Sequence, residues 1–219
     1  MPKISIITRC RNRLEYTAQV LDAVKRNTLL TDYEHIIVDN YSSDGTYEWF
    51  TWLQQNCSHW YDKVKYLRME RNTGDWGGML AGFQEASGDF IVQLDNDIIP
   101  CSGWLTALAE VLINSQYKAV MLKRDNVAWK LKPQSRSKMI GDYEVCKIER
   151  VVACYMMRTE HFSMISRAIP ESQGLKSKYI MAKMLNPLGK ILNRTCIELQ
   201  ADDQRVKYSP KNPEIWEKV

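Results

Sequence analysis

Short apolar runs alternate along the chain with longer stretches in which apolar residues recur every three or four positions. The runs are typical of buried strands, and the stretches are typical of amphipathic helices. The stretch 14–27 carries one such apolar stripe, and Asn12 is its expected N-terminal cap. The pattern predicts strands at 3–8, 35–39, 64–69, 89–95 and 117–122, and helices at 14–27, from about 46, at 78–86 and at 104–114.

The remainder of the chain is less regular. We expect irregular strands or loops over 123–150, a strand at 151–157 and a short helix near 159–166. Residues 179–194 place basic side chains between apolar ones at helical spacing, with a proline and a glycine interrupting the pattern. This segment predicts a basic amphipathic helix.

Strands that alternate with helices in this way form a mostly parallel central sheet with helices on both faces, the Rossmann-like α/β class. Such sheets bind ligands at the carboxyl ends of their strands. We therefore expect the functional residues in the loops that follow the first four strands. These loops hold residues 8–13, 39–45, 71–78 and 95–97.

The composition is that of an ordinary globular protein, with 219 residues, 45% hydrophobic and 26% charged. It excludes collagen, coiled coils, low-complexity disorder and disulfide miniproteins. The six cysteines show no C-x-x-C spacing, which argues against a zinc site and for reduced, buried thiols. The sequence contains no long apolar run and its start lacks the features of a signal peptide, so we expect a cytoplasmic protein.

Charge is unevenly distributed although the net charge is only +4. Residues 1–117 carry 10 basic and 15 acidic side chains, whereas residues 118–197 carry 16 basic and 6 acidic ones. The basic part could face phosphates, either along nucleic acid at 118–138 or on an anionic membrane through 179–194. A solvated basic surface fits the same charge pattern.

Asp95-Asn96-Asp97 follows directly after a predicted apolar strand. Two carboxylates two residues apart can converge on one hard cation, and Mg²⁺ or Mn²⁺ often shares such ligands with a substrate diphosphate. The other interpretation is an acidic turn without a ligand.

Asp39 ends the second predicted strand, where a carboxylate can accept a hydrogen bond from a nucleobase N–H. The residues after it, Ser43 to Thr46, fit a turn followed by a helix cap. We assign a capping role to Asp44 and Thr46 and a functional role to Asp39.

A glycine-containing loop precedes the third predicted helix, with Asn72, Gly74 and Gly78 in it. Glycines let the backbone approach a ligand and leave N–H groups for anions. Arg71 could pair with a phosphate. A tight turn with close packing of the helix on the sheet would explain the same glycines.

Taken in order, the segments ISIITRCRNR, HIIVDNYSSDGT, RNTGDWGG and AGFQEASGDFIVQLDND resemble the nucleotide-diphosphosugar glycosyltransferases of family 2, which have the GT-A fold. The resemblance is close over about residues 3–105. No G-x-G-x-x-G follows the first strand and no GK[ST] follows a glycine loop, so a dinucleotide-dependent dehydrogenase and a P-loop enzyme are disfavoured.

This resemblance implies a single GT-A domain over 1–219, with a nucleotide-sugar donor half at 1–117 and an acceptor half at 118–219. It implies a metal-dependent, inverting glycosyltransferase that uses Mn²⁺ or Mg²⁺. The donor would be a UDP- or dTDP-sugar, and the acceptor a hydroxyl of a glycan or lipid-linked glycan, with peripheral membrane contact through 179–194. Two alternatives stay open: an enzyme that modifies a DNA base, and a GT-A-like binding module without catalysis.

The resemblance also implies roles for individual residues. Asp95 and Asp97 would bind the metal. The base that takes the acceptor proton would be Asp202 or Asp203, in the segment Ala201–Arg205 that is nearest to the family's acidic motif, with Glu171 as a rival. The donor would contact Thr8, Arg9, Asp39, Asn40, Arg71, Asn72, Gly74, Gly78, Asp95 and Asn96.

Overall fold

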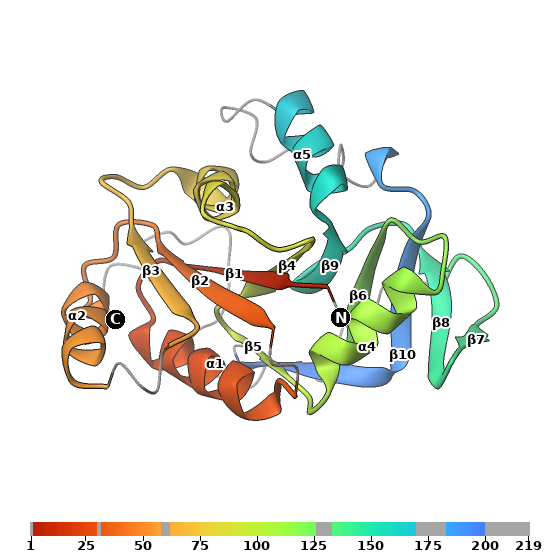
Figure 1. Ribbon diagram of the computed structural model, residues 1–219, viewed down its shortest axis with the longest axis horizontal. Helices are drawn as coiled ribbons and strands as arrows, with labels where there is room; N and C mark the ends of the chain where they lie inside the picture. Colours follow the sequence, from red (N-terminus) through yellow and green to blue (C-terminus); the bar gives the residue numbers. More distant parts are fainter. Residues whose placement is uncertain (1, 30–31, 58–61, 126–132, 170–182, 200–219) are drawn as a thin grey trace, which may run out of the picture.

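The predicted alternation of strands and helices is found in the computed structural model, which describes residues 2–29, 32–57, 62–125, 133–169 and 183–199 (Figure 1). The first half of the chain forms β1 (Ile4–Cys10), α1 (Leu14–Asn27), β2 (Tyr33–Asp39), α2 (Thr46–Asn56), β3 (Val64–Arg68), α3 (Gly74–Gln84), β4 (Phe90–Asp95), β5 (Ile98–Pro100) and α4 (Trp104–Ile113). The second half forms β6 (Ala119–Arg124), β7 (Lys138–Ile140), β8 (Tyr143–Ile148), β9 (Cys154–Arg158), α5 (Thr159–Ala168) and β10 (Leu188–Glu198).

One sheet runs through both halves, in the order β3-β2-β1-β4-β9-β6-β10-β8-β7, and β5 pairs with β10. β1 to β4 are mutually parallel, and β6 and β10 are parallel to each other. The strands β9, β8 and β5 pair antiparallel with their neighbours and bring the second half into the same sheet. The α/β class with a mostly parallel sheet is therefore confirmed.

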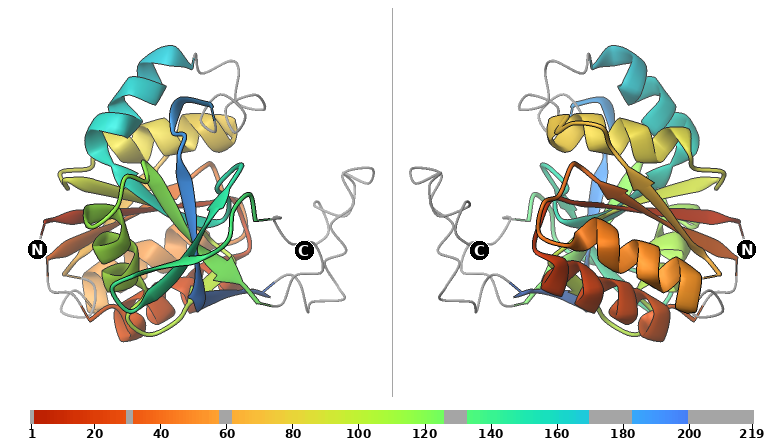
Figure 2. Two further views of the ribbon diagram at one scale, coloured as in Figure 1. Left: turned by 90° about the vertical axis from the view of Figure 1, so that its right-hand side faces the viewer. Right: turned by 90° about the vertical axis from the view of Figure 1, so that its left-hand side faces the viewer.

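Helices cover both faces of the sheet, because the strands are apolar on both sides. Ile4 and Ile6 pack in one cluster with α1 and α4, whereas Ile7 packs in another with α3 and α5. Figure 2 shows α3 and α5 on one face and α1, α2 and α4 on the other. The helix α3 lies very close to the sheet, since a Cβ added at Gly82 would lie 2.5 Å from Ile7 Cγ2.

The basic helix expected over 179–194 is wrong from Leu188 onward, where the chain forms the strand β10. The apolar spacing fits a helix, but Leu188 to Ile191 are buried in the middle of the sheet between β6 and β8. The aromatic ring of Tyr117 packs directly against the backbone of Gly189. A Cβ added at Gly189 would lie 2.9 Å from Tyr117 Cδ2. These residues therefore present no amphipathic face to a membrane, and residues 179–182 lie outside the described part.

Further details differ from the sequence expectation. The strand expected at 151–157 is β9, which begins at Cys154. The helix α3 begins at Gly74 rather than near 78. Residues 138–148, expected to be irregular, form the β7–β8 hairpin, with Gly141 in the turn at φ 55°. Asn12 does not cap α1; instead the backbone N–H of Leu14 donates to Asp44 Oδ2 from the loop after β2.

No helix in the described ranges has the length and apolar character needed to span a bilayer.

Candidate functional site

The carboxyl ends of β1, β2, β3 and β4 lie at one edge of the sheet, because these strands are parallel. The register places Arg9 opposite Asp95 and Cys10 opposite Asp39. The loops that the sequence singled out after these strands are therefore neighbours in space. This edge is the candidate site.

Asp95 is held at the end of β4 by three groups. Its Oδ1 accepts hydrogen bonds from Arg9 Nη2 at 3.0 Å and from Gln93 Nε2 at 3.0 Å. Its backbone N–H donates to the carbonyl oxygen of Ala153 at 2.9 Å. The side chain stays 36% exposed, so the carboxylate is fixed in place and still open to a ligand.

Asp97, the second carboxylate, lies beside Arg13, with Oδ2 3.6 Å from Nη1 of the guanidinium. Its backbone carbonyl accepts a hydrogen bond from the N–H of Leu199 at 2.8 Å, which ties the end of β10 to the same turn. Asn96, between the two carboxylates, donates from Nδ2 to Thr17 Oγ1 on α1. The turn is thus supported from three different elements.

Asp39 is fully buried at the end of β2. Its carboxylate accepts hydrogen bonds from the N–H of Ser42 at 2.8 Å and the hydroxyl of Tyr66 at 2.6 Å, and Arg68 Nη1 lies at 3.5 Å. Burial and the neighbouring Asp39 carboxylate raise the pKa of Tyr66. A nucleobase N–H would have to share or replace these partners, so the base-reading role of Asp39 stays a prediction.

The side chain of Asn40 fastens the loop that leads into α3. Its Oδ1 accepts hydrogen bonds from the N–H and the hydroxyl of Thr73, and its Nδ2 donates to Asn72 Oδ1 and to the carbonyl of Gly74. All the hydrogen-bonding capacity of this amide is used within the protein. Asn40 therefore acts here by holding the loop.

The other predicted loop residues differ in exposure. Arg71 and Asn72 are exposed, and Gly74 has φ 70° with open space around it. Gly78 faces the Arg9 side chain, which would lie 3.5 Å from an added Cβ. Gly78 is buried within α3, whereas Arg71, Asn72 and Gly74 are exposed, and the donor contacts expected for these residues stay predictions.

Thr8 lies beneath the site. It is fully buried, and its hydroxyl is 2.8 Å from His35 Nε2 on β2. Burial lowers the pKa of His35 to about 3, so the imidazole is neutral at physiological pH. As placed, Thr8 offers no surface to a donor, which argues against the direct contact expected for it.

The three candidate bases, Glu171, Asp202 and Asp203, lie outside the described residues. The chain positions that precede them are described. Ile169 is buried and accepts a hydrogen bond from the indole N–H of Trp76, near the start of α3, at 3.2 Å. Leu199 is bonded to Asp97. Both segments therefore leave the described structure close to elements of the site.

Two carboxylates are the metal-binding groups that this edge offers. Within the described ranges, no group of three or more His, Cys, Asp or Glu side chains is arranged to hold a metal ion. Mg²⁺ and related hard cations are commonly held by one or two carboxylates together with substrate phosphates and water. The oxygen ligands of Asp95 and Asp97 fit a cation of that kind.

Sequence reasoning missed the residues that hold the two carboxylates. Gln93 also accepts a hydrogen bond from the buried hydroxyl of Tyr155, which fixes the amide that donates to Asp95. Arg13 and Ala153 both have left-handed backbones, at φ 59° and 63°. The alternation of side chains along β4 could have predicted that Gln93 lies on the same face as Asp95. The positive φ angles of Arg13 and Ala153 could not be predicted, because only glycine marks such positions in a sequence.

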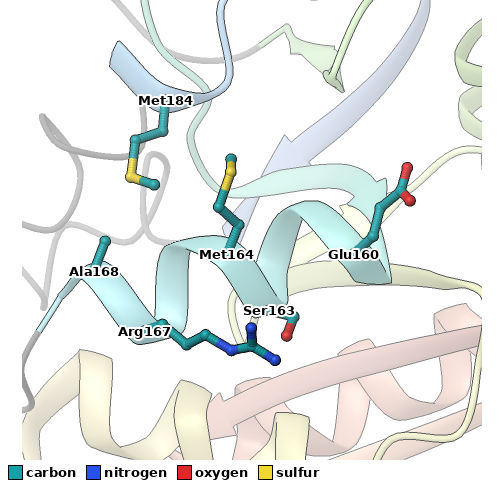
Figure 3. A pocket seen from close by; sticks show the side chains of 6 residues that line it. All are labelled: Glu160, Ser163, Met164, Arg167, Ala168 and Met184. Atoms are coloured by element: carbon teal, nitrogen blue, oxygen red, sulfur yellow. The ribbon is translucent and has the colours of Figure 1, made fainter.

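A separate pocket of about 600 Å³ lies along α5. Figure 3 shows Met164 on α5 beside the segment that carries Met184. None of the predicted site residues is among the lining residues in the described part, which are Glu160, Ser163, Met164, Arg167, Ala168 and Met184.

The family model for glycosyl transferase family 2 matches residues 5–172. A relative from Campylobacter jejuni, GalNAc(5)-diNAcBac-PP-undecaprenol beta-1,3-glucosyltransferase, is 27% identical over 185 residues, covering 82% of this chain and 56% of the relative. The chain spans between 29% and 56% of the length of the curated relatives compared with it.

Solved structures of the same fold are known. The crystal structure of S. aureus TarS in complex with UDP-GlcNAc has a TM-score of 0.66 and 17% identity, covering 90% of this chain and 58% of that one. The mannosyltransferase PcManGT from Pyrobaculum calidifontis, in complex with GDP-Man and Mn²⁺, has a TM-score of 0.69 and 15% identity, covering 90% of this chain and 57% of that one. The GT-A fold expected from the sequence is confirmed.

Proposed function

The chain belongs to glycosyl transferase family 2, and on that premise we propose that it transfers a sugar from a nucleoside-diphosphate donor to a hydroxyl acceptor, with inversion and with a divalent cation at Asp95 and Asp97. The observation that carries the proposal is the pair of carboxylates at the end of β4, flanked by Arg9 and Arg13, with Arg9 also donating a hydrogen bond to the carbonyl of Asp75 in α3. Carboxylates for a cation and arginines for phosphates are the groups that a diphosphate requires.

Residues 1–117 form the donor half of a single GT-A domain in this proposal, and residues 118–219 form the acceptor half. The donor is a UDP- or dTDP-sugar. TarS was solved with UDP-GlcNAc, which supports a uridine nucleotide, and PcManGT was solved with Mn²⁺, which supports Mn²⁺ or Mg²⁺ as the cation.

The acceptor is a glycan or a lipid-linked glycan. The Campylobacter relative is named for an undecaprenol-linked glycan, which supports the lipid-linked form. The relatives with a stated substrate are named for lipid-linked sugars, and these names give the DNA-base alternative no support. The membrane contact expected through 179–194 required an amphipathic helix. Leu188 to Arg194 instead belong to β10, so that basis for a membrane contact is gone.

The proposed chemistry combines the residues at this edge with a base from the segments outside the described residues. A carboxylate base, Asp203, Asp202 or Glu171, takes the proton of the acceptor hydroxyl as the oxygen attacks the anomeric carbon from the face opposite the leaving group. The cation, when bound, stabilises the negative charge that develops on the departing diphosphate. Arg9, which lies 3.0 Å from Asp95, would contribute positive charge beside the diphosphate, and Asn40 keeps the loop before α3 in position.

The test is thermal stability against UDP-, GDP-, dTDP- and CMP-sugars, each with and without Mn²⁺. A ligand at 100 times its Kd adds about 2.7 kcal/mol of stability, which raises the Tm by several degrees in a domain of this size. We expect stabilisation by one nucleotide, only with metal, and its loss in Asp97→Ala. Asp22→Ala, which removes a partly exposed carboxylate of α1 that pairs with Arg26, is the matched control. No stabilisation by any nucleotide would refute the donor site.

Stabilisation without turnover would favour the binding-module alternative. Hydrolysis or transfer of the donor sugar, followed by release of nucleoside diphosphate, separates the two cases. Activity that is lost in Asp97→Ala and kept in Asp22→Ala would establish the enzyme.

A further inference from the structure

Each carboxylate of the pair faces its own arginine, Arg9 near the end of β1 and Arg13 at the start of α1. Arg9 Nη2 lies 3.0 Å from Asp95 Oδ1, and Arg13 Nη1 lies 3.6 Å from Asp97 Oδ2. The side chains of Arg9, Arg13 and Asp97 are at most 19% exposed. These are pairs at partly buried positions, where charges are screened less than at the surface.

The backbone that carries Arg13 is unusual. Asn12 and Arg13 both have left-handed φ angles, 57° and 59°, which residues with a Cβ adopt rarely and at a cost. The loop after β2 enforces this conformation, since Asn12 N–H donates to Ser42 Oγ and Ser43 N–H donates to Asn12 Oδ1. The strained turn thus connects Arg13 to the loop after β2, where the nucleobase is expected.

The charges of these four side chains cancel: two carboxylates oppose two guanidinium groups. A divalent cation at Asp95 and Asp97 would leave two positive charges in excess. The diphosphate of a nucleotide sugar carries one negative charge on each phosphate, so the excess would match it. Asp75, which also approaches Arg9 at 3.7 Å, is 76% exposed, and solvent screens its charge.

We propose that Arg13 is a positioning residue that holds Asp97 while the cation is absent and turns to the donor diphosphate when the cation binds. This inference rests on the proposed function and deepens it. Its consequence is thermodynamic coupling. While the arginines neutralise the carboxylates, the carboxylates attract a cation only weakly. While the carboxylates neutralise the arginines, the arginines attract a diphosphate only weakly. Cation and nucleotide therefore each strengthen the binding of the other.

The experiment measures Mn²⁺ binding directly, by titration calorimetry and by the electron paramagnetic resonance signal of free Mn²⁺, with and without saturating UDP. In the unmodified protein we expect UDP to lower the Kd for Mn²⁺ about tenfold or more, within the 5–150-fold range typical of coupled sites. In Arg13→Gln we expect Mn²⁺ alone to bind several-fold tighter, because a competing positive charge is gone. UDP should bind more weakly and the coupling should fall.

These opposite shifts distinguish positioning from a merely structural role, which would weaken both ligands together and lower the Tm. Arg11→Gln is the matched control, since Arg11 is exposed and in the same loop. Arg13→Lys should keep the wild-type affinity for Mn²⁺ alone but lose part of the coupling, because an ammonium group cannot make a two-pronged contact with phosphate. This variant decides the question if Arg13→Gln does not fold.

The outcomes separate the two proposals. If the unmodified protein binds neither Mn²⁺ nor UDP, the proposed function fails. If it binds both but the two Kd values are independent, or if the Arg13 variants keep the full coupling, the donor site stands and the role of Arg13 is overturned.

Discussion

The backbone N–H of Leu199 donates a hydrogen bond to the carbonyl oxygen of Asp97 at 2.8 Å. This bond joins the end of β10 to the turn between the two carboxylates, although the residues are far apart in the sequence. The acidic segment that begins at Asp202 follows Leu199 by three residues. The bond therefore brings Leu199, the last described residue, to the edge where the donor is expected.

We predict that Asp203→Asn abolishes sugar transfer but leaves metal-dependent nucleotide binding unchanged. The amide has nearly the same shape as the carboxylate and cannot take a proton from the acceptor hydroxyl. General-base catalysis typically contributes 10²–10⁴-fold, so we expect a loss of kcat of that order with little change in the Kd of UDP. Normal transfer by this variant would move the assignment to Asp202 or Glu171, which are tested by the same substitution to the amide.

Asn40→Ala should destabilise the protein by about 1–3 kcal/mol, because it leaves the N–H of Thr73 and the carbonyl of Gly74 without their partner. It should also weaken nucleotide binding, since the glycine loop loses its fastening. Urea unfolding and UDP titration measure the two effects. Asn114→Ala, which removes an exposed amide bonded only to the backbone of its own helix, should change neither. Unaltered binding by Asn40→Ala would show that the loop does not depend on this side chain.

His35 makes the stability depend on pH. Burial lowers its pKa from 6.5 to about 3, so the unfolded chain takes up a proton below pH 6.5 that the folded protein does not accept. The stabilisation from neutral His35 is complete above pH 6.5 and is lost as the pH falls toward 3. At pH 5 the free energy of unfolding has decreased by about 2 kcal/mol on this account. The free energy of unfolding at pH 7 and pH 5 checks this.

His35→Gln should remove most of the difference in unfolding free energy between these two pH values. His161→Gln is the control, because burial lowers the pKa of His161 as well but that side chain is only partly buried. An equal pH dependence in the unmodified protein and in His35→Gln would contradict the assignment.

Gly82→Ala should cost about 1–3 kcal/mol, because the new methyl group would overlap Ile7 Cγ2 at 2.5 Å and Val38 Cγ2 at 3.0 Å and force α3 away from the sheet. Gly78→Ala in the same helix provides the comparison. Its methyl group would meet Arg9 Cγ at an ordinary 3.5 Å, and replacing a helical glycine stabilises by about 0.5–1 kcal/mol. Thermal unfolding of both variants checks this. A lower Tm for Gly82→Ala and an unchanged or higher Tm for Gly78→Ala would show that the close packing at Gly82, and not the loss of a helical glycine, causes the destabilisation.

Local patterns were sufficient to predict the parallel half of the sheet and the acidic turn after β4. The apolar runs of β1, β2 and β4 are short and bounded by polar loops, so their carboxyl ends could be located from the sequence, and the carboxylates Asp39, Asp95 and Asp97 with them. The N-cap of α2 is Gly45 rather than Asp44 or Thr46, although the Asp44 carboxylate accepts hydrogen bonds from the N–H of Thr46 and from that of Leu14 at the start of α1.

Features that depend on distant partners could not be predicted in this way. In β10 the apolar positions happen to recur at helical spacing, and only its place between β6 and β8 decides for a strand. The amide of Asn40 is used up by Thr73 and Asn72, more than thirty residues along the chain. A donor contact was expected for Asn40 because nothing in its own segment reveals those partners.

The position of β10 has a consequence for how the protein is made. A strand near the end of the described chain lies between β6 and β8 and pairs with β5 beside the acidic turn. During synthesis, the backbone groups of β6 and β8 that pair with β10 therefore stay unpaired until residues 188–198 have left the ribosome. Unpaired edges are prone to associate with other chains. Chains cut before Leu188 should consequently aggregate rather than yield a smaller donor-binding fragment.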